Sequence, residues 1–243
     1  MTEQKKVLGV IGGLGPAATA YFMELVTRMT DATVDQQHLQ MLIYSCPFVP
    51  DRTAYILDNS KPSPLEPMIE IGNRLAQQGA QIIAIPCLTA HYFYDVLSRG
   101  ICVPVIHGIE QTVRHLKENG ITRVGIMATD GTIKAGLFHS ALQAQDMEPI
   151  VPDDAGQKDV MHLIYQNIKA DLPADMDRFH AVRQQLQRKG AQAIILGCTE
   201  LSLIKRDYQI GAGFIDAMQV LAQCSIIQCG APLKKAYECL ITK

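Results

Sequence analysis

The chain has 243 residues, of which 48% are hydrophobic and 19% charged, and its formal net charge is −2. This composition is typical of a globular protein, and the near-neutral charge argues against a nucleic-acid partner. No apolar run approaches the roughly 20 residues of a transmembrane helix, and residues 1–6 lack the pattern of a signal peptide. We therefore expect a cytoplasmic protein without a membrane partner.

Apolar segments alternate with amphipathic segments of helical length along most of the chain. The expected strands are rich in Ile, Val and Leu, as is typical of parallel strands that are covered on both faces. They span residues 7–11, 40–44, 81–85, 103–106, 123–128, 193–196 and 213–215. The expected helices span residues 16–29, 65–78, 109–119, 133–145, 159–169, 175–189 and 216–228. Gly79, Gly120 and Gly190 stand where helices end. This alternation predicts an α/β fold with parallel sheets.

Two segments of the chain repeat each other. Residues 79–87 (GAQIIAIPC) resemble residues 190–198 (GAQAIILGC), and a second matching pair, residues 8–11 and 124–127, precedes them in the same order. We therefore predict two similar lobes, each a parallel sheet flanked by helices, related by a pseudo-twofold axis with the active site between them. The expected first lobe is discontinuous, residues 1–105 plus 209–243, with Asp216 marking the returning strand. Residues 106–208 would form the second lobe.

Cysteine usage separates two candidates from the rest. The seven cysteines are odd in number and irregularly spaced, which argues against a disulfide framework, and no Cys-x-x-Cys or Cys–His spacing predicts a metal site. A free cysteine is by default a small buried hydrophobic residue. Cys87 and Cys198, however, follow expected parallel strands at the edge where open α/β sheets bind ligands. A helix N-terminus beside each would lower the thiol pKa and favour the thiolate.

Two opposed thiols can exchange a proton at a stereocentre. One removes the α-proton as thiolate while the other donates from the opposite face. The carbanion-like state needs stabilisation, for which backbone N–H groups near Gly13, the turn before the Pro16 helix, are candidates. Thr129 and Thr132 are the expected counterparts of that turn in the second lobe. Four further residues near the cysteines have open roles: Thr89 and Thr199 as helix caps or ligand contacts, His91 as a thiolate-orienting or capping group, and Glu200 as a complement to a helix dipole.

Four motifs together resemble the aspartate/glutamate racemase family. They are GGLGPAAT at residues 12–19, PDRTAYIL at 50–57, PCLTAH at 86–91 and GCTE at 197–200, in the family's order and over nearly the whole chain. The resemblance implies a racemase of a small acidic amino acid, aspartate or glutamate, with Cys87 and Cys198 as the catalytic pair. It also implies that no pyridoxal phosphate or other cofactor is used, and that the protein is a homodimer.

The same resemblance assigns substrate contacts. Arg52 would bind the distal carboxylate through its planar fork, and Lys169 would be a second substrate-binding cation. The chain departs from the family at Leu88, where Asn is usual and would contact the substrate, and at Asp171, where Gly is frequent. Cys46 would lie near the pocket or be buried. The expected substrate-binding set is Gly13, Arg52, Leu88, Thr89, Thr129, Thr132, Lys169, Thr199 and Glu200, with no metal.

Three alternatives stay open. The pattern Gly13-x-Gly15-x-x-Ala18 resembles a dinucleotide fingerprint, but no acidic residue ends the next strand at Tyr44–Pro47, as that fingerprint requires. A related isomerase or decarboxylase of a small diacid would often retain only one of the two cysteines. A binding protein that has lost turnover would fit the change at Leu88. The intact cysteine pair favours the racemase.

Overall fold

The computed structural model describes residues 5–243, which form two parallel β-sheets flanked by helices. The first sheet has the order β2-β1-β3 and the second the order β5-β4-β6-β7. Their strands are β1 (Leu8–Gly12), β2 (Met41–Ser45), β3 (Ile82–Ala84), β4 (Arg123–Met127), β5 (Glu148–Ile150), β6 (Ala193–Leu196) and β7 (Phe214–Asp216). All strand pairs are parallel, as the apolar sequence runs predicted.

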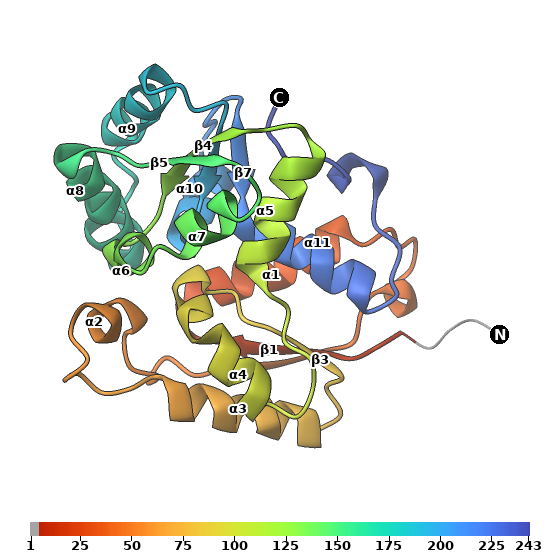
Figure 1. Cartoon of the computed structure of the whole chain (residues 1–243). Coiled ribbons are helices and arrows are strands. Elements are labelled where there is room, and N and C mark those ends of the chain that lie inside the picture. Colours follow the sequence, from red (N-terminus) through yellow and green to blue (C-terminus); the bar gives the residue numbers. More distant parts are fainter. Residues whose placement is uncertain (1–4) are drawn as a thin grey trace.

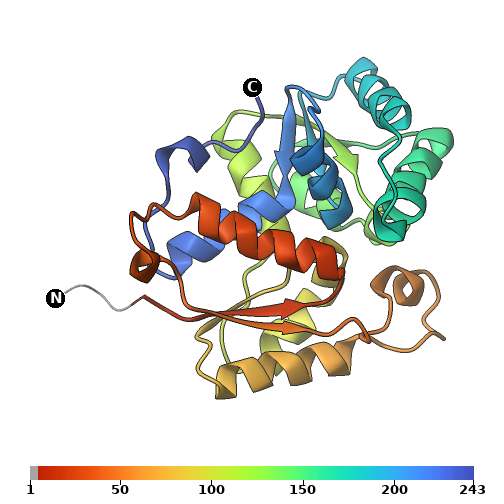
Figure 2. The same cartoon turned by 180° about the vertical axis from the view of Figure 1, so that it is seen from behind.

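Helices cover the sheets and fill the space between them (Figures 1 and 2). The α-helices are α1 (Pro16–Met29), α2 (Arg52–Leu57), α3 (Leu65–Gln77), α4 (Tyr94–Gly100), α5 (Gly108–Glu118), α6 (Asp130–Lys134), α7 (Leu137–Gln143), α8 (Asp154–His162), α9 (Met176–Arg188), α10 (Thr199–Asp207) and α11 (Ala217–Gln228). Shorter segments are η1 (Asp35–Gln37), η2 (Leu88–Phe93), η3 (Leu163–Asn167), η4 (Ile168–Ala170) and η5 (Lys235–Tyr237). Within residues 5–243, no helix combines the length and apolar character needed to cross a membrane.

One apolar core runs through both halves of the molecule. Helices α1 and α11 pack against each other between the two sheets, and α5 packs against α11 (Figures 1 and 2). The same cluster of fully buried side chains includes Val10 of β1, Phe22 of α1, Ile126 of β4 and Leu221 of α11. The two sheets are therefore held together by shared helices.

The sequence repeat corresponds to a repeat of structure. Strand β1 pairs with β2 and β3 as β4 pairs with β5 and β6. In register, Gly9 faces Ile83 in the first sheet, and Gly125 faces Ile194 in the second. A Cβ at Gly9 would lie 2.5 Å from Ile83 Cδ1, and one at Gly125 would lie 3.0 Å from Ile194 Cγ1. Each sheet thus has a glycine where a neighbouring isoleucine needs the room.

Two expected elements differ because of single residues. Residues 103–106 make only an isolated bridge, Val105 to Ile83, since Pro104 has no N–H to donate to a ladder. The expected helix 133–145 is broken into α6 and α7 at Gly136, whose φ of 64° ends the first helix.

Two other elements differ from expectation because the apolar pattern of the sequence does not reveal them. Strand β5 was not expected, because it has three residues and contains Pro149, which its place at the sheet edge tolerates. The expected helix 159–169 begins earlier, at Asp154 behind the N-cap Asp153, and continues as the π-helical η3 and the 3₁₀-helical η4.

The C-terminal strand stays with the second sheet. β7 pairs with β6 of the second sheet. We expected the strand ending at Asp216 to return to the first sheet, and it does not. Helix α11, which follows that strand, packs against α1, and so does α10. The lobe boundaries after residues 105 and 208 stay a prediction, and residues 1–4 of the expected first lobe lie outside the described residues.

Asp216 is a fully buried carboxylate that joins three elements. Its Oδ1 accepts hydrogen bonds from the backbone N–H groups of Met218 (3.0 Å) and Gln219 (3.4 Å), and from Ser202 Oγ (2.6 Å). The side chain therefore caps α11 and fixes α10, the helix that begins directly after Cys198.

We expect Asp216→Ala to lower the free energy of unfolding by about 3 kcal/mol, since it removes a cap and leaves the buried Ser202 hydroxyl unpaired. Urea unfolding followed by circular dichroism would measure the change. Asp175→Ala is the matched control, because Asp175 caps α9 at the surface and should cost about 1 kcal/mol. Equal losses in the two variants would contradict the structural role of Asp216.

Candidate active site

The structure brings Cys87 and Cys198 to one inner pocket. Cys87 follows β3 and begins η2, and Cys198 follows β6 and begins α10. Both are buried, with 7% and 6% of their surface exposed. The pocket is lined from both halves of the molecule and has a volume of about 10 Å³, room for about one water molecule. The repeat thus places the two thiols at equivalent strand ends on a single small space.

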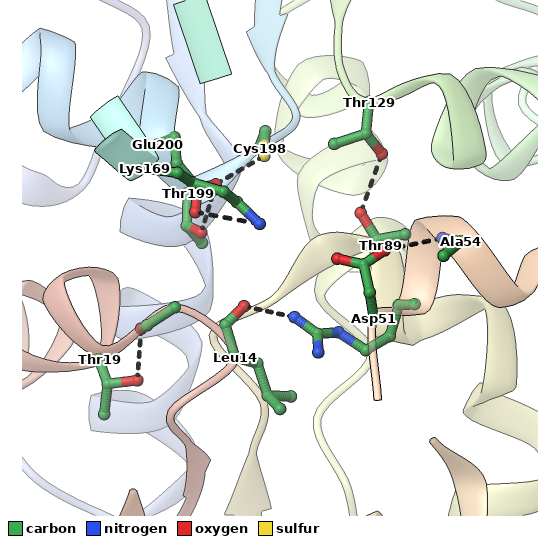
Figure 3. A network of polar contacts seen from close by, with 12 residues as sticks. Leu14, Thr19, Asp51, Ala54, Thr89, Thr129, Lys169, Cys198, Thr199 and Glu200 are labelled. Atoms are coloured by element: carbon green, nitrogen blue, oxygen red, sulfur yellow. Dashed lines mark hydrogen bonds and ion pairs between the residues drawn. The ribbon is translucent and has the colours of Figure 1, made fainter. Parts of the chain in front are cut away.

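A buried carboxylate controls the proton on Cys198. Cys198 Sγ donates a hydrogen bond to Glu200 Oε2 at 2.8 Å, and Thr199 Oγ1 donates to the same oxygen at 3.3 Å (Figure 3). Lys169 Nζ lies 3.9 Å from Glu200 Oε1. Glu200 has only 4% of its surface exposed. It therefore does more than complement a helix dipole, because it holds the thiol proton and an ion pair together.

The pKa of Cys198 is raised well above its ordinary value. Burial is the largest cause, the charge and hydrogen bond of Glu200 add to it, and Lys169 opposes it in part. The expected lowering by a helix N-terminus is wrong for this thiol, because desolvation and a neighbouring carboxylate outweigh the helix. Burial also acts to lower the pKa of Lys169, but Glu200 and Cys198 raise it more, so Lys169 is charged.

Arg52 is a buried cation fixed by backbone carbonyls. Its Nη1 donates to Val49 O at 3.2 Å and Pro50 O at 3.0 Å, and its Nη2 donates to Leu14 O at 2.8 Å. Burial would lower the pKa of Arg52, yet the pKa is raised, and the charge of Cys87 is the first cause acting in that direction. The cation and the Cys87 thiol are therefore electrostatic neighbours.

The unused donors of Arg52 form one edge of the guanidinium. Three of its five N–H groups bind the carbonyls, which leaves Nε–H and one Nη2–H. Nε is buried and has no hydrogen-bond partner among residues 5–243. Because Nε–H and Nη2–H can point in parallel from that edge, the pair matches the two oxygens of a carboxylate.

Three threonine hydroxyls meet between the two halves. Thr89 of η2, Thr129 before α6 and Thr132 within α6 have Oγ1 atoms 3.1 Å from one another in all three pairs (Figure 3 draws the Thr89–Thr129 contact). Thr129 Oγ1 also accepts from Thr132 N at 3.3 Å, which caps α6. Thr89 and Thr129 line the inner pocket, whereas Thr132 is not among its lining residues and holds the other two from behind.

A wider outer compartment of about 570 Å³ adjoins the inner pocket. Gly13 lines it with φ of +83°, and a Cβ there would lie 2.3 Å from the backbone nitrogen of Cys46, so only glycine fits. The Gly13 N–H donates to Thr19 Oγ1 at 2.8 Å (Figure 3 labels Thr19) and is therefore not free to bind an anion, whereas anion binding by the other N–H groups of this turn stays a prediction. Cys46 itself is half-buried and does not line either compartment.

Two residues beside Cys87 supply packing. Leu88 is buried in the main apolar core and lines the inner pocket, so no side-chain hydrogen bond is available there. His91 is buried, and its Nδ1 donates to Cys87 O at 3.2 Å. Burial, with a smaller effect of His107, lowers the pKa of His91 to about 4, so the ring is neutral at physiological pH. Its hydrogen bond reaches the backbone of Cys87, which fits a role in holding the turn.

Several lining residues were missed in the sequence. Tyr165, Leu14, Asp51 and Thr53 also line the inner pocket. The Tyr165 ring lies 4.6 Å from Lys169 Nζ, and the spacing of four residues, which puts side chains on one helical face, was the available signal.

Asp171 lies at the outer compartment and is exposed. Its φ of 58° is left-handed, a conformation that favours glycine, and Lys169 pairs with Glu200 rather than with Asp171. Within the described part of the chain, no group of three or more His, Cys, Asp or Glu side chains could hold a metal ion.

Comparison with known proteins gives the family. The model of the Asp/Glu/hydantoin racemase family matches residues 11–224. The chain belongs to this family. The family predicted from the four sequence motifs is therefore confirmed, and with it the coarse assignment to amino-acid racemases.

Relatives of this racemase-family protein include the broad specificity amino-acid racemase RacX of Bacillus subtilis, 28% identical over 90% of this chain and 96% of the relative. The structure of Picrophilus torridus aspartate racemase is 29% identical, with a TM-score of 0.82, and the match covers 97% of this chain and 99% of that one. An aspartate racemase homologue from Pyrococcus horikoshii is 22% identical, covers 93% and 99% of the two chains, and has a TM-score of 0.73, a likeness of fold alone.

We expect Glu200→Gln to lower the pKa of Cys198, because it removes the carboxylate charge that helps keep the thiol protonated. The pKa should still exceed that of a free cysteine, since burial is unchanged. Thiolate absorbance at 240 nm, titrated in the Cys87→Ser background with and without Glu200→Gln, would measure the shift, and Cys198→Ser would identify the signal. An unchanged or raised pKa would contradict this account of Glu200.

Proposed function

We propose that the protein is a cofactor-independent racemase that interconverts the L and D enantiomers of an acidic amino acid, aspartate or glutamate. The observation that carries the proposal is the pair of buried thiols on one pocket with opposite surroundings. Arg52, a cation, is an electrostatic neighbour of Cys87, whereas Glu200 accepts the proton of Cys198 in a hydrogen bond. One thiol is thus suited to act as a base and the other as an acid.

In the proposed reaction, the Cys87 thiolate takes the α-proton from one face of the substrate. The electron pair left on Cα spreads into the substrate carboxylate, and the Cys198 thiol donates its proton to the opposite face. Cys87 is then a thiol and Cys198 a thiolate, whose charge the Lys169 ammonium balances. The reverse reaction exchanges the two roles and needs neither a metal nor an organic cofactor.

The acidic side chain is assigned to the free edge of Arg52. That edge is buried, its donors Nε–H and Nη2–H are unused, and the backbone carbonyls hold the group in place. Lys169 and the hydroxyls of Thr89, Thr129 and Thr199 would contact the substrate's polar groups from the other side. Leu88 offers no hydrogen bond, so recognition relies more on the charge of Arg52. The name of one relative, an aspartate racemase, supports this class of substrate.

The oligomeric state is inferred from the family resemblance. We propose a homodimer on that basis, with a small acidic amino acid as the substrate.

We expect Cys87→Ser and Cys198→Ser each to reduce racemisation of both enantiomers by at least about a thousandfold, since each face needs its own acid or base. The measurement is conversion of pure L- and D-aspartate and glutamate by polarimetry, with proton NMR of α-proton exchange in D₂O. Cys102→Ser, a change at an exposed cysteine, is the control. Near-full turnover in either catalytic variant would rule out the two-base scheme.

Arg52→Ala should reduce kcat/KM for aspartate by roughly a hundredfold, because a charge-assisted bidentate contact is lost. A neutral amino acid such as alanine, tested at higher enzyme concentration, should lose less than about tenfold. Arg52→Lys is the informative companion, since it retains the charge but not the fork, and it should recover only part of the aspartate activity. An equal loss for acidic and neutral substrates would count against side-chain recognition by Arg52.

A further inference from the structure

The inner pocket and the outer compartment are neighbouring spaces, and the residues that line both form the junction between them. Both are lined by the same five residues, Leu14, Asp51, Arg52, Lys169 and Glu200. The inner pocket, with its two thiols, measures about 10 Å³ and the outer compartment about 570 Å³, more than fifty times as much. The inner pocket has no room for a whole amino acid, so a substrate whose Cα lies between the sulfurs must extend into the outer compartment.

The charged residues differ between the junction and the outer compartment. The cations Arg52 and Lys169 stand at the junction, where a distal carboxylate of a short side chain would stop. Beyond the junction the wall is apolar, formed by Pro16, Ala17, Ala18, Pro47, Val49, Ile168 and Leu203. The charged residue that lines only the outer compartment is Asp171, an exposed carboxylate. A second carboxylate would find repulsion there, whereas methylene groups would find apolar contacts.

We propose that the outer compartment is a side-chain subsite, through which the protein also racemises amino acids with long, unbranched, uncharged side chains. The class comprises side chains of four or more non-hydrogen atoms, such as that of methionine. This inference rests on the proposed function, since the same two thiols perform the proton exchange. The apolar wall contributes to kcat/KM by covering the part of the side chain beyond the junction.

Ala17 provides a variant that fills the compartment without disturbing the core. It lies in the first turn of α1, is exposed and lines the outer compartment. Ala20, three residues later on the same helix, is also exposed but is not among the lining residues. Ala17→Phe and Ala20→Phe therefore make the same chemical change inside and outside the subsite.

The experiment measures kcat/KM for L-methionine and L-aspartate in the full-length protein, with α-proton exchange in D₂O as an independent readout. The wild type should exchange the α-proton of methionine. Ala17→Phe should reduce kcat/KM for methionine by about tenfold or more and change that for aspartate by less than about threefold, while Ala20→Phe changes neither. Equal melting temperatures of the two variants would show that the fold is preserved.

Two results would overturn the proposal and leave the proposed function intact. One is a wild type that racemises aspartate but exchanges no α-proton of methionine. The other is an Ala17→Phe variant that loses methionine and aspartate activity equally, which would make the compartment an entrance common to both. Absence of exchange with every amino acid, aspartate included, would instead refute the proposed function itself.

Discussion

Glu200 places a carboxylate within hydrogen-bonding distance of Cys198, in a space with room for about one water molecule. In so dry a site the charge of each group depends on its neighbours more than on its intrinsic pKa. Burial and, after it, the carboxylate keep the Cys198 thiol protonated, and the ion pair of the carboxylate with Lys169 keeps that lysine charged. The remaining features, from the position of α10 to the cation near Cys87, are arranged around this local balance of charge.

The two halves share a scaffold but differ in the residues that follow the two cysteines. Two residues after Cys87 the chain has Thr89, and two residues after Cys198 it has Glu200. Thr89 contacts the turn after β4 through Thr129, whereas Glu200 lies close to Gly15 in the turn after β1. The repeated backbone therefore supplies two equivalent thiols, and the different side chains that follow them make their surroundings unlike. An acid and a base are needed at once, so a strictly symmetric pair would be less suited to the reaction.

Much of this arrangement could be predicted from the sequence because it depends on local pattern. Apolar runs indicated the parallel strands, and the matching segments ending at Cys87 and Cys198 indicated equivalent strand ends. The protonation of Cys198 could not be predicted in this way, since it results from burial and from Glu200, and the expected helix effect was outweighed. The partner of β7 could not be predicted either. β7 pairs with β6, but the sequence of a short apolar strand does not determine which strand it pairs with. The roles of the site residues stay predictions, although the structure gathers most of them on one pocket.

Under the proposed function, Arg52 would serve both recognition and catalysis. The three carbonyls that hold its guanidinium are acceptors without net charge, so they fix the group without neutralising it. Its positive charge therefore acts on both Cys87 and any carboxylate that reaches the free edge. Leu88 offers no side-chain hydrogen bond in this pocket, so under the proposed function the recognition of a side-chain carboxylate would depend on Arg52.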